Sequence, residues 1–254
     1  MSGHSKWSTI KHQKGVADAK RGQLFTKLTQ EIIVAVRQGG SNPEANFRLR
    51  LAIQKARDSS MPLENIERAI KRGSGTLEGA TLAEMVIEGY APSGTAILVQ
   101  ALSDNRNRTL QNVRNIFSRN GGSLGESGCV AWLFDSKGVV TVKAVDLDAD
   151  ELALQAIDAG ADDVKVENNF VEIYTKPEEL EKVRGALEQK NLPVASAELS
   201  MVPKTMVELD EKAALQTLKL LDKLEELDEV QHVSSNADFS DSVLEKYQSQ
   251  ANVA

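Results

Sequence analysis

The stretch Met85–Leu102, which reads MVIEGYAPSGTAILVQAL, marks the point where the chain changes from helix-forming to strand-forming sequence. Two apolar runs, Met85–Tyr90 and Thr95–Leu102, flank residues 91–94 (APSG), which have the length and composition of a hairpin turn. Because a short turn returns the chain beside itself, we predict two antiparallel strands here. The stretch therefore predicts that an α+β region begins near residue 80.

The sequence on the C-terminal side of this hairpin continues the α+β pattern. Apolar residues at helical spacing predict a helix over residues 109–120, which a pair of glycines ends. A short apolar run then predicts a strand over Val130–Phe134. This unit has only the order β-β-α-β, and a later amphipathic helix over residues 211–227 and a strand over residues 232–235 complete it.

A second α+β unit lies between those two parts. Its predicted elements follow the order β-α-β-β-α-β, which is the ferredoxin-like pattern. The strands are expected over residues 139–144, 164–166, 170–174 and 195–201, and the helices over residues 148–159 and 177–189. We therefore infer that this unit is inserted into a discontinuous middle domain.

The sequence on the N-terminal side of the hairpin predicts a small helical domain. Large apolar residues recur every four positions over residues 23–38, which favours a helix. Two more helices are expected, one over residues 44–58 and one that follows Pro62 and stops at Gly73. Residues 74–80, which are rich in glycine and small polar side chains, have the composition of a linker.

Together these patterns predict an α+β protein of three domains. The expected parts are a basic helical domain at residues 1–78, a discontinuous α+β domain at residues 79–135 and 204–240, an inserted ferredoxin-like α+β domain at residues 136–203, and a C-terminal tail at residues 241–254. The chain has 254 residues, of which 41% are hydrophobic, so it is long enough to bury more than one core.

Charge is distributed very unevenly along the chain. Residues 1–75 contain 14 Lys and Arg against 6 Asp and Glu, a net charge of +8, whereas residues 136–254 contain 12 against 25, a net charge of −13. The overall net charge of −7 hides this segregation. A basic segment beside an acidic one is expected when only one end of a protein approaches phosphates. The acidic half has two interpretations: it contacts a protein partner, or it repels non-specific nucleic acid.

The compartment follows from cysteine usage and from hydropathy. Cys129 is the single cysteine, so no intrachain disulfide can form, which fits a reducing compartment. The N-terminal residues are polar and charged, unlike a signal peptide, and the apolar runs are far shorter than a membrane span. We therefore expect a cytoplasmic protein with no membrane partner.

The first candidate binding site is the polar and basic run at residues 3–14. It combines cations and hydroxyl groups, which suit phosphate contacts, with an indole that can stack on an unpaired base. The residues expected to bind nucleic acid are Lys6, Trp7, Lys11, His12 and Lys14. The alternative is a flexible tail in which the indole fills a crevice.

The second candidate is a set of cations along the N-terminal helices. Each one taken alone is explained as a solvated helix charge, and those at a helix C-terminus also suit the helix dipole. As a set with few acids between them they favour a phosphate track, without distinguishing DNA from RNA. The set comprises Lys20, Arg21, Lys27, Arg48, Arg50, Lys55, Arg57, Arg68, Lys71 and Arg72.

The third candidate is the loop at residues 103–109, between a predicted strand and a predicted helix. Free N–H groups at a helix start, with Arg106 and Arg108 beside them, can hold a phosphate. The alternative is a capped connection with no ligand, in which Asn107 or Arg108 precedes the first turn.

Catalysis finds little support in the sequence. No paired cysteines or histidines have the spacing of a zinc site, and no glycine-rich loop matches a phosphate-binding motif. Cys129 precedes an apolar strand and is most simply a core residue. We therefore expect no enzyme activity, no metal and no cofactor.

Several motifs distributed over nearly the whole chain resemble the YebC family, bacterial proteins usually described as probable transcriptional regulators. The matching motifs are residues 1–7 (MSGHSKW), 10–14 (IKHQK), 18–22 (DAKRG), 25–28 (FTKL), 46–50 (NFRLR), 88–94 (EGYAPSG), 104–109 (DNRNRT) and 121–125 (GGSLG). The resemblance implies a helical N-terminal domain followed by two α+β domains, with no catalytic residues.

The resemblance leaves two functions open. In its usual description the family binds DNA and controls transcription. Its mitochondrial relative is a translational activator for cytochrome c oxidase, and bacterial members are linked to ribosomes stalled on proline-rich sequence. Either function places a basic segment on nucleic acid, and we expect a DNA-binding transcriptional regulator, with a ribosome-associated translation factor that contacts ribosomal RNA as the alternative.

Overall fold

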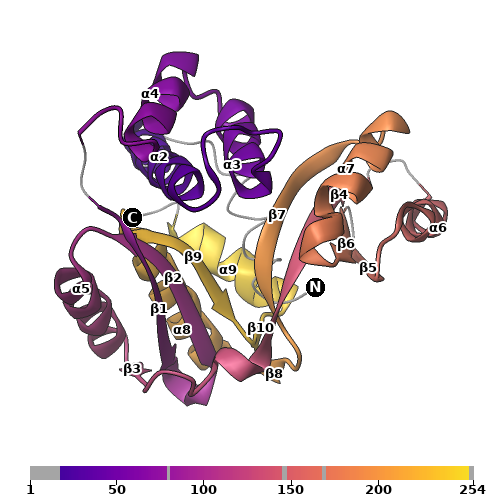
Figure 1. Cartoon of the computed structure of the whole chain (residues 1–254). Coiled ribbons are helices and arrows are strands. Elements are labelled where there is room, and N and C mark those ends of the chain that lie inside the picture. The colour runs from indigo at the N-terminus through magenta and orange to yellow at the C-terminus, as the bar shows by residue number, and fades with distance from the viewer. Residues whose placement is uncertain (1–17, 79–80, 145–147, 168–169, 252–254) are drawn as a thin grey trace.

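The computed structural model describes residues 18–78, 81–144, 148–167 and 170–251. It has a helical N-terminal unit and two α+β units, so the predicted fold class is confirmed (Figure 1). The exact domain boundaries stay a prediction. Within these residues, no helix is long and apolar enough to cross a membrane.

The N-terminal unit packs three helices, α2 (Asp18–Gly39), α3 (Phe47–Asp58) and α4 (Leu63–Gly73). The apolar residues that predicted the first helix are buried in its core, among them Leu28, Ile32 and Val36. The helix α3 begins three residues later than expected, because the side chain of Asn46 caps it by accepting the N–H of Leu49.

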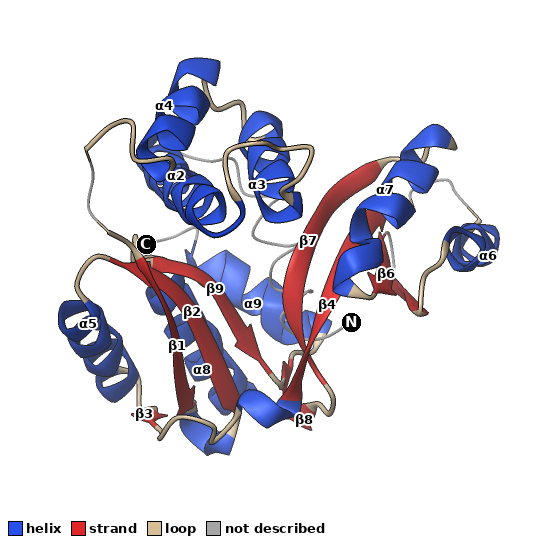
Figure 2. Ribbon diagram, in the orientation of Figure 1, coloured by secondary structure: helices blue, strands red, loops and turns tan. Residues whose placement is uncertain are grey.

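The middle unit is a sheet with the strand order β3-β1-β2-β9, covered on one face by helices (Figure 2). Its strands are β1 (Ala83–Tyr90), β2 (Ala96–Ser103), β3 (Ser123–Leu124) and β9 (Val230–Ser235), and its helices are α5 (Arg106–Arg119) and α8 (Glu211–Glu225). Because β9 pairs with β2, the late helix and strand return to the sheet that the hairpin began. One core joins both parts of the chain, with Ile97 and Val99 packed in the same cluster as Leu218 and Leu221.

The second α+β unit has the strand order β5-β6-β4-β7, all antiparallel, with two helices. Its strands are β4 (Phe134–Lys143), β5 (Asp163–Glu167), β6 (Phe170–Thr175) and β7 (Val194–Pro203), and its helices are α6 (Ala149–Ala159) and α7 (Leu180–Gln189). The paired strands β4 and β7 are the long arch seen in Figure 1. At their base, Phe134 pairs with Pro203, where the chain passes to and from the middle unit.

Two segments differ in kind, and not only in their bounds, from the sequence-based expectation. The strand predicted over Val130–Phe134 is wrong, because residues 131–133 form a 3-10 turn and Phe134 begins β4. The backbone N–H groups of residues 130 and 131 donate to the carboxylate of Glu88, so they are not available to a neighbouring strand.

The segment expected as a C-terminal tail also differs. Residues Asp241–Ala251 form a helix, α9. Val243 and Leu244 are buried in the core of the middle unit, and Tyr247 packs against it. The helix is therefore held by apolar packing, which its short amphipathic pattern did not reveal. Two short strands, β8 (Val207–Glu208) and β10 (Ala237–Asp238), pair in parallel nearby.

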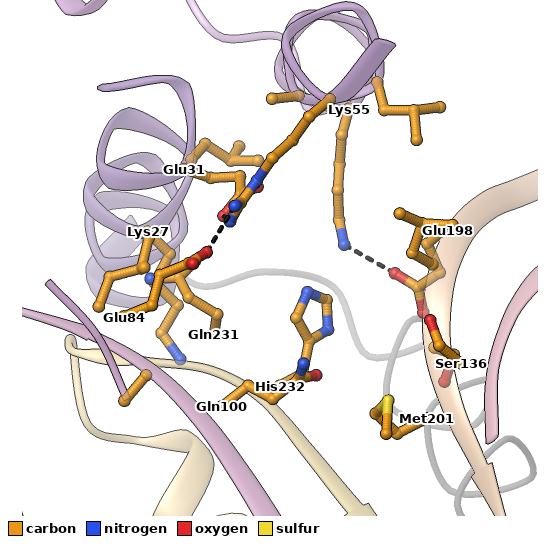
Figure 3. A pocket seen from close by; sticks show the side chains of 18 of the residues that line it. Lys27, Glu31, Lys55, Glu84, Gln100, Ser136, Glu198, Met201, Gln231 and His232 are labelled. Carbon is orange, nitrogen blue, oxygen red and sulfur yellow. Dashed lines mark hydrogen bonds and ion pairs between the residues drawn. The ribbon is translucent and has the colours of Figure 1, made fainter. Parts of the chain in front are cut away.

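The three units surround a cavity of about 410 Å³. Its walls come from α2 and α3, from the middle sheet and from β4 and β7 (Figure 3). Three cations line it, Lys27, Arg48 and Lys55, together with three carboxylates, Glu31, Glu84 and Glu198. The equal numbers make this wall electrostatically balanced, so it does not attract a polyanion.

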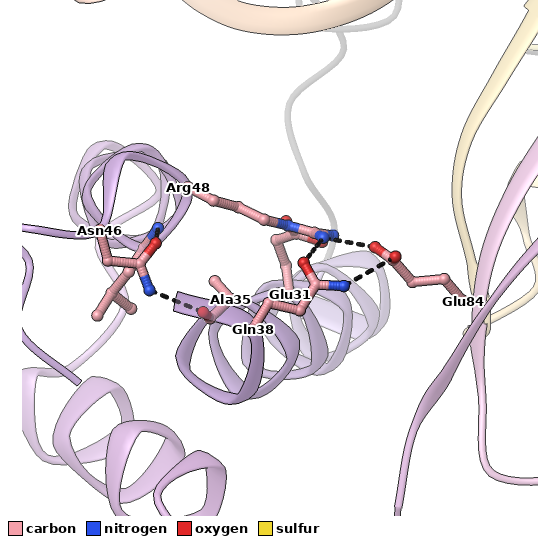
Figure 4. A network of polar contacts seen from close by, with 7 residues as sticks. Glu31, Ala35, Gln38, Asn46, Arg48 and Glu84 are labelled. Carbon is pink, nitrogen blue, oxygen red and sulfur yellow. Dashed lines mark hydrogen bonds and ion pairs between the residues drawn. The ribbon is translucent and has the colours of Figure 1, made fainter. Parts of the chain in front are cut away.

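Asn46 links the end of α2 to the start of α3 by hydrogen bonds. Its side chain is 5% exposed, accepts from the N–H of Leu49 at 3.0 Å, and donates to the carbonyls of Ala35 at 2.7 Å and Gly40 at 2.8 Å (Figure 4). Gly39 is needed beside it, since a Cβ there would lie 2.7 Å from the Asn46 side chain. One side-chain amide thus provides hydrogen-bond partners for two carbonyls near the end of α2 and for one N–H group at the start of α3.

We expect Asn46→Ala to lower the free energy of unfolding by about 1–3 kcal/mol, because it removes a helix cap and leaves two carbonyls without their donor. Asn46→Asp should restore part of this, since a carboxylate keeps the cap but cannot donate. Urea unfolding followed by circular dichroism measures both. The matched control is Asn42→Ala, whose side chain accepts one exposed N–H from Glu44. An equal loss in the control would contradict the role given to Asn46.

Candidate nucleic-acid interface

The predicted binding residues of the N-terminal run lie outside the described residues. These are Lys6, Trp7, Lys11, His12 and Lys14. The backbone of Lys20 lies in the first turn of α2. Binding of nucleic acid by these six residues stays a prediction.

Arg48 belongs to a polar network that joins the N-terminal helices to the middle sheet. Its guanidinium donates to Glu31 of α2 at 2.7 Å, and it also pairs with Glu84 of β1 (Figure 4). Gln38 accepts from Arg48 at 2.6 Å and donates to Glu84 at 2.9 Å. Burial alone would lower the pKa of Arg48, but the two carboxylates outweigh it and raise the pKa above its ordinary value. The charge of Arg48 is thus compensated inside the molecule.

Two further cations of α3 pair with the acidic second α+β unit. Arg50 donates from Nε to both carboxylate oxygens of Glu181 in α7, at 2.7 Å each. Lys55 contacts Glu198 of β7 at 2.7 Å (Figure 3). The ammonium of Lys27 donates to the backbone carbonyl of Glu225 at 2.6 Å. These three cations were predicted to contact phosphates. In this structure they contact carboxylate or carbonyl oxygens of the same chain.

The loop before α5 is a capped connection, but the cap is Asn105, and Asn107 and Arg108, which were expected to precede the first turn, lie inside the helix. The side chain of Asn105 accepts the N–H of Arg108 at 3.1 Å, so the helix begins at Arg106, earlier than expected. Arg108 also pairs with Asp104 at 2.6 Å and approaches Glu229 at 3.5 Å. Arg106 itself is exposed. The phosphate site proposed from the sequence at this helix start stays a prediction. One of its two arginines, Arg108, already contacts carboxylates.

The other predicted cations are exposed on the N-terminal helices. Arg57 lies in the last turn of α3, and Lys71 and Arg72 lie in the last turn of α4. Arg68 of α4 is exposed, and Arg21 lies 5.7 Å from the centre of the Phe25 ring. These five side chains, unlike those of α3 that face the other units, lie where phosphates can reach them.

Sequence reasoning missed a basic surface on α5. Its side chains Arg114 and Arg119 are exposed, and the helix contains four arginines with no acidic residue. The signal was present in the sequence, because α5 carries all four cations of residues 76–135. An acid-free basic helix of this kind is an electrostatic feature that phosphates recognise without base specificity.

Metal chemistry finds no support in the described part of the chain, where no three His, Cys, Asp or Glu side chains are grouped to hold an ion. Cys129 is half-buried and packs beside a small cluster that contains Ala96, Leu98 and Val130. Its surroundings match the packing role expected for it.

Two family models cover most of the chain. The model described as the TACO1/YebC protein N-terminal domain matches residues 5–76, and the model described as the TACO1/YebC second and third domain matches residues 82–237. The chain belongs to the TACO1/YebC family. The resemblance found in the sequence motifs is therefore confirmed.

Similar proteins of the family cover the chain almost completely. A probable transcriptional regulatory protein of Dehalococcoides mccartyi is 64% identical over 99% of this chain and all of its own length. One from Natranaerobius thermophilus is 50% identical over 96% of this chain and 99% of its own. The crystal structure of a conserved hypothetical protein from Aquifex aeolicus, 47% identical, superposes with a TM-score of 0.82 over 91% of this chain and 98% of that one.

The Arg48 network should contribute measurably to stability in this family member. We expect Arg48→Met to lower the free energy of unfolding by about 1–2 kcal/mol at neutral pH, because it leaves Glu31 and Glu84 without their partner. Arg57→Met in the same helix, where the side chain is exposed, should change it by less than about 0.5 kcal/mol. Denaturant unfolding of both variants checks this, and equal effects would contradict it.

The same network predicts a pH dependence. Burial alone would raise the pKa of Glu84, but hydrogen bonds from Arg48 and Gln38 outweigh it and hold the pKa below its ordinary value. A carboxyl group with a lowered pKa stabilises the fold above its unfolded-state pKa, and this is lost as pH falls through the folded-state value. The difference in stability between wild type and Arg48→Met should therefore shrink below about pH 4. A difference that stays constant from pH 7 to pH 3 would be inconsistent with this.

Proposed function

We propose that this protein is a non-enzymatic regulator of gene expression that binds nucleic acid through its basic N-terminal segment, and that it acts on duplex DNA to control transcription. The observation that carries the proposal is the segregation of charge, with a net charge of +8 in residues 1–75 against −13 in residues 136–254. The relatives are named as probable transcriptional regulatory proteins, which supports a role in transcription.

The contacts of α3 refine which residues take part in this proposal. Arg48, Arg50 and Lys55 are held by carboxylates, so the phosphate contacts are assigned first to the N-terminal run and to the exposed cations of α4. Two of those carboxylates, Glu181 and Glu198, come from the acidic unit. In this view the acidic unit also competes with phosphates for α3. A protein partner for the acidic half stays a prediction.

One observation favours the second candidate function, a translation factor that contacts ribosomal RNA. Base readout in duplex DNA requires a helix or ribbon that can enter a groove. Three side chains of α3 are committed to contacts with α2, with the middle sheet and with the acidic unit. The cations of α3 are therefore not presented on a free recognition helix, and an arrangement of this kind suits irregular RNA at least as well.

Charge reversal tests the binding end itself. We expect Lys6→Glu, Lys11→Glu and Lys14→Glu together to weaken binding to DNA and RNA at low salt and to flatten the dependence of affinity on salt. The matched control reverses three lysines of the acidic half, Lys176, Lys190 and Lys219, which are exposed. Fluorescence anisotropy across a salt series measures both. Binding that survives the first change, or falls equally in the control, would show that the N-terminal segment is not the binding end.

Crosslinking in cells followed by sequencing separates the two candidate functions. The proposal expects recovered DNA that is enriched at promoters and lost in the Lys6, Lys11 and Lys14 variant. Recovery of ribosomal RNA without enriched promoters would rule out the transcription proposal and select the translation factor instead. The control lysine variant should behave as wild type in this experiment.

A further inference from the structure

Trp132 is a large aromatic side chain that the fold leaves in solvent. It is 66% exposed, although the chain has only two tryptophans. Its indole N–H donates to the carbonyl of Cys129 at 3.1 Å. The one polar group of this side chain is therefore satisfied within the protein, and what it offers to a ligand is the flat face of the ring.

The turn that carries Trp132 is held by a buried carboxylate. Glu88 is 5% exposed and accepts the N–H groups of Gly128 at 2.6 Å, Val130 at 2.7 Å and Ala131 at 2.8 Å. Burial alone would raise the pKa of Glu88, but these three donors outweigh it and hold the pKa below its ordinary value. The carboxylate is thus charged at neutral pH and fixes the turn from beneath.

The other side of the turn is held by the strand that returns from the second α+β unit. Lys204 donates from its ammonium to the carbonyl of Trp132 and from its backbone N–H to the carbonyl of Leu133, both at 2.9 Å. Val130, two residues before Trp132, is completely buried. The indole therefore stands on a rigid base. Less conformational entropy is then lost when a ligand binds to it.

The surroundings of Trp132 suit a nucleic-acid base better than a protein. The preceding residues 125–128 (GESG) are exposed and small or polar, with one acid, Glu126, so they add no large apolar side chain next to the ring in the sequence. The ammonium of Lys204 lies 3.2 Å from Asp135, which leaves this pair near neutral. The stacking itself uses only the π face of a base, while charge contacts to the backbone can come from elsewhere on the protein. Protein hot spots, by contrast, lie within a desolvated apolar surround.

We propose that Trp132 is a stacking platform for an unpaired base of bound nucleic acid. This inference rests on one part of the proposed function, the binding of nucleic acid, and not on a duplex target, since an unpaired base comes from a single-stranded region. The platform lies away from the N-terminal helices: Glu84, near the start of β1, contacts α3, whereas Glu88, four residues later, holds the turn. It therefore provides a second point of contact, which acts by stacking and not by charge.

The chain has a built-in reporter for this contact. In a Trp7→Phe background Trp132 is the single tryptophan, so its fluorescence reports on stacking directly. All affinities are compared within this background, because Trp7 belongs to the proposed binding segment. The probes are short adenylate single strands, as RNA and as DNA, each also paired with its complement.

Single strands should quench the emission of Trp132, and the paired strands should quench it much less. Adding Trp132→Ala should weaken single-strand binding about 5- to 100-fold, the range typical of base stacking on an aromatic ring, and leave the salt dependence unchanged. Trp132→Phe should retain most of the affinity. The RNA and DNA arms show which kind of strand supplies the base.

The matched control is Leu154→Ala on α6, whose side chain is 65% exposed and belongs to the other α+β unit. It should not change binding, and thermal unfolding should show both alanine variants folded. Unchanged affinity in Trp132→Ala, or binding without quenching, would overturn the platform while leaving the proposed function in place. If the unaltered protein binds no nucleic acid at all, the proposed function fails and the platform fails with it.

Discussion

Opposite charges meet where the N-terminal helices rest on the two α+β units. Arg48 joins α3 to the middle sheet through Glu84, and Arg50 and Lys55 join it to the second unit through Glu181 and Glu198. Ion pairs that are partly exposed contribute modestly to stability one by one. Their geometric effect is larger, because they set how α3 faces both units and enclose the cavity between all three. The placement of the helical unit depends on this set of contacts.

These contacts change the meaning of the charge segregation. A net charge of +8 in the first 75 residues indicates a polyanion, but part of that charge neutralises acidic residues of the same molecule. Through Glu181 and Glu198 the acidic half is an intramolecular partner of α3. Its two other interpretations, contact with a protein partner and repulsion of non-specific nucleic acid, stay predictions. The cations that stay available for the proposed phosphate contacts are those of the N-terminal run, the exposed ones of α4, Arg21 and Arg57, and the basic surface of α5.

A buried carboxylate has a comparable role at the other end of β1. Glu88 binds three backbone N–H groups and replaces an expected strand with a turn that presents Trp132. Charge-assisted hydrogen bonds in a buried site are strong and directional, so a single side chain can determine the path of the chain here. Charge thus works in two ways in this molecule: pairs of side chains position whole units, and one carboxylate shapes a surface turn.

The sequence by itself determined most of the helices, the hairpin and the order of the elements in the second α+β unit, because apolar periodicity and turn residues act over a few positions. It did not reveal α9, and it placed a strand where residues 131–133 form a 3-10 turn. It also indicated a basic end and a family. It could not decide which cations are available to a ligand, since Arg50 and Glu181 are 131 residues apart in the chain and Lys55 and Glu198 are 143 apart. Nor could it place Glu88 beneath a turn 40 residues later. Such pairings exist only after the units have packed, and the tertiary structure alone decided them.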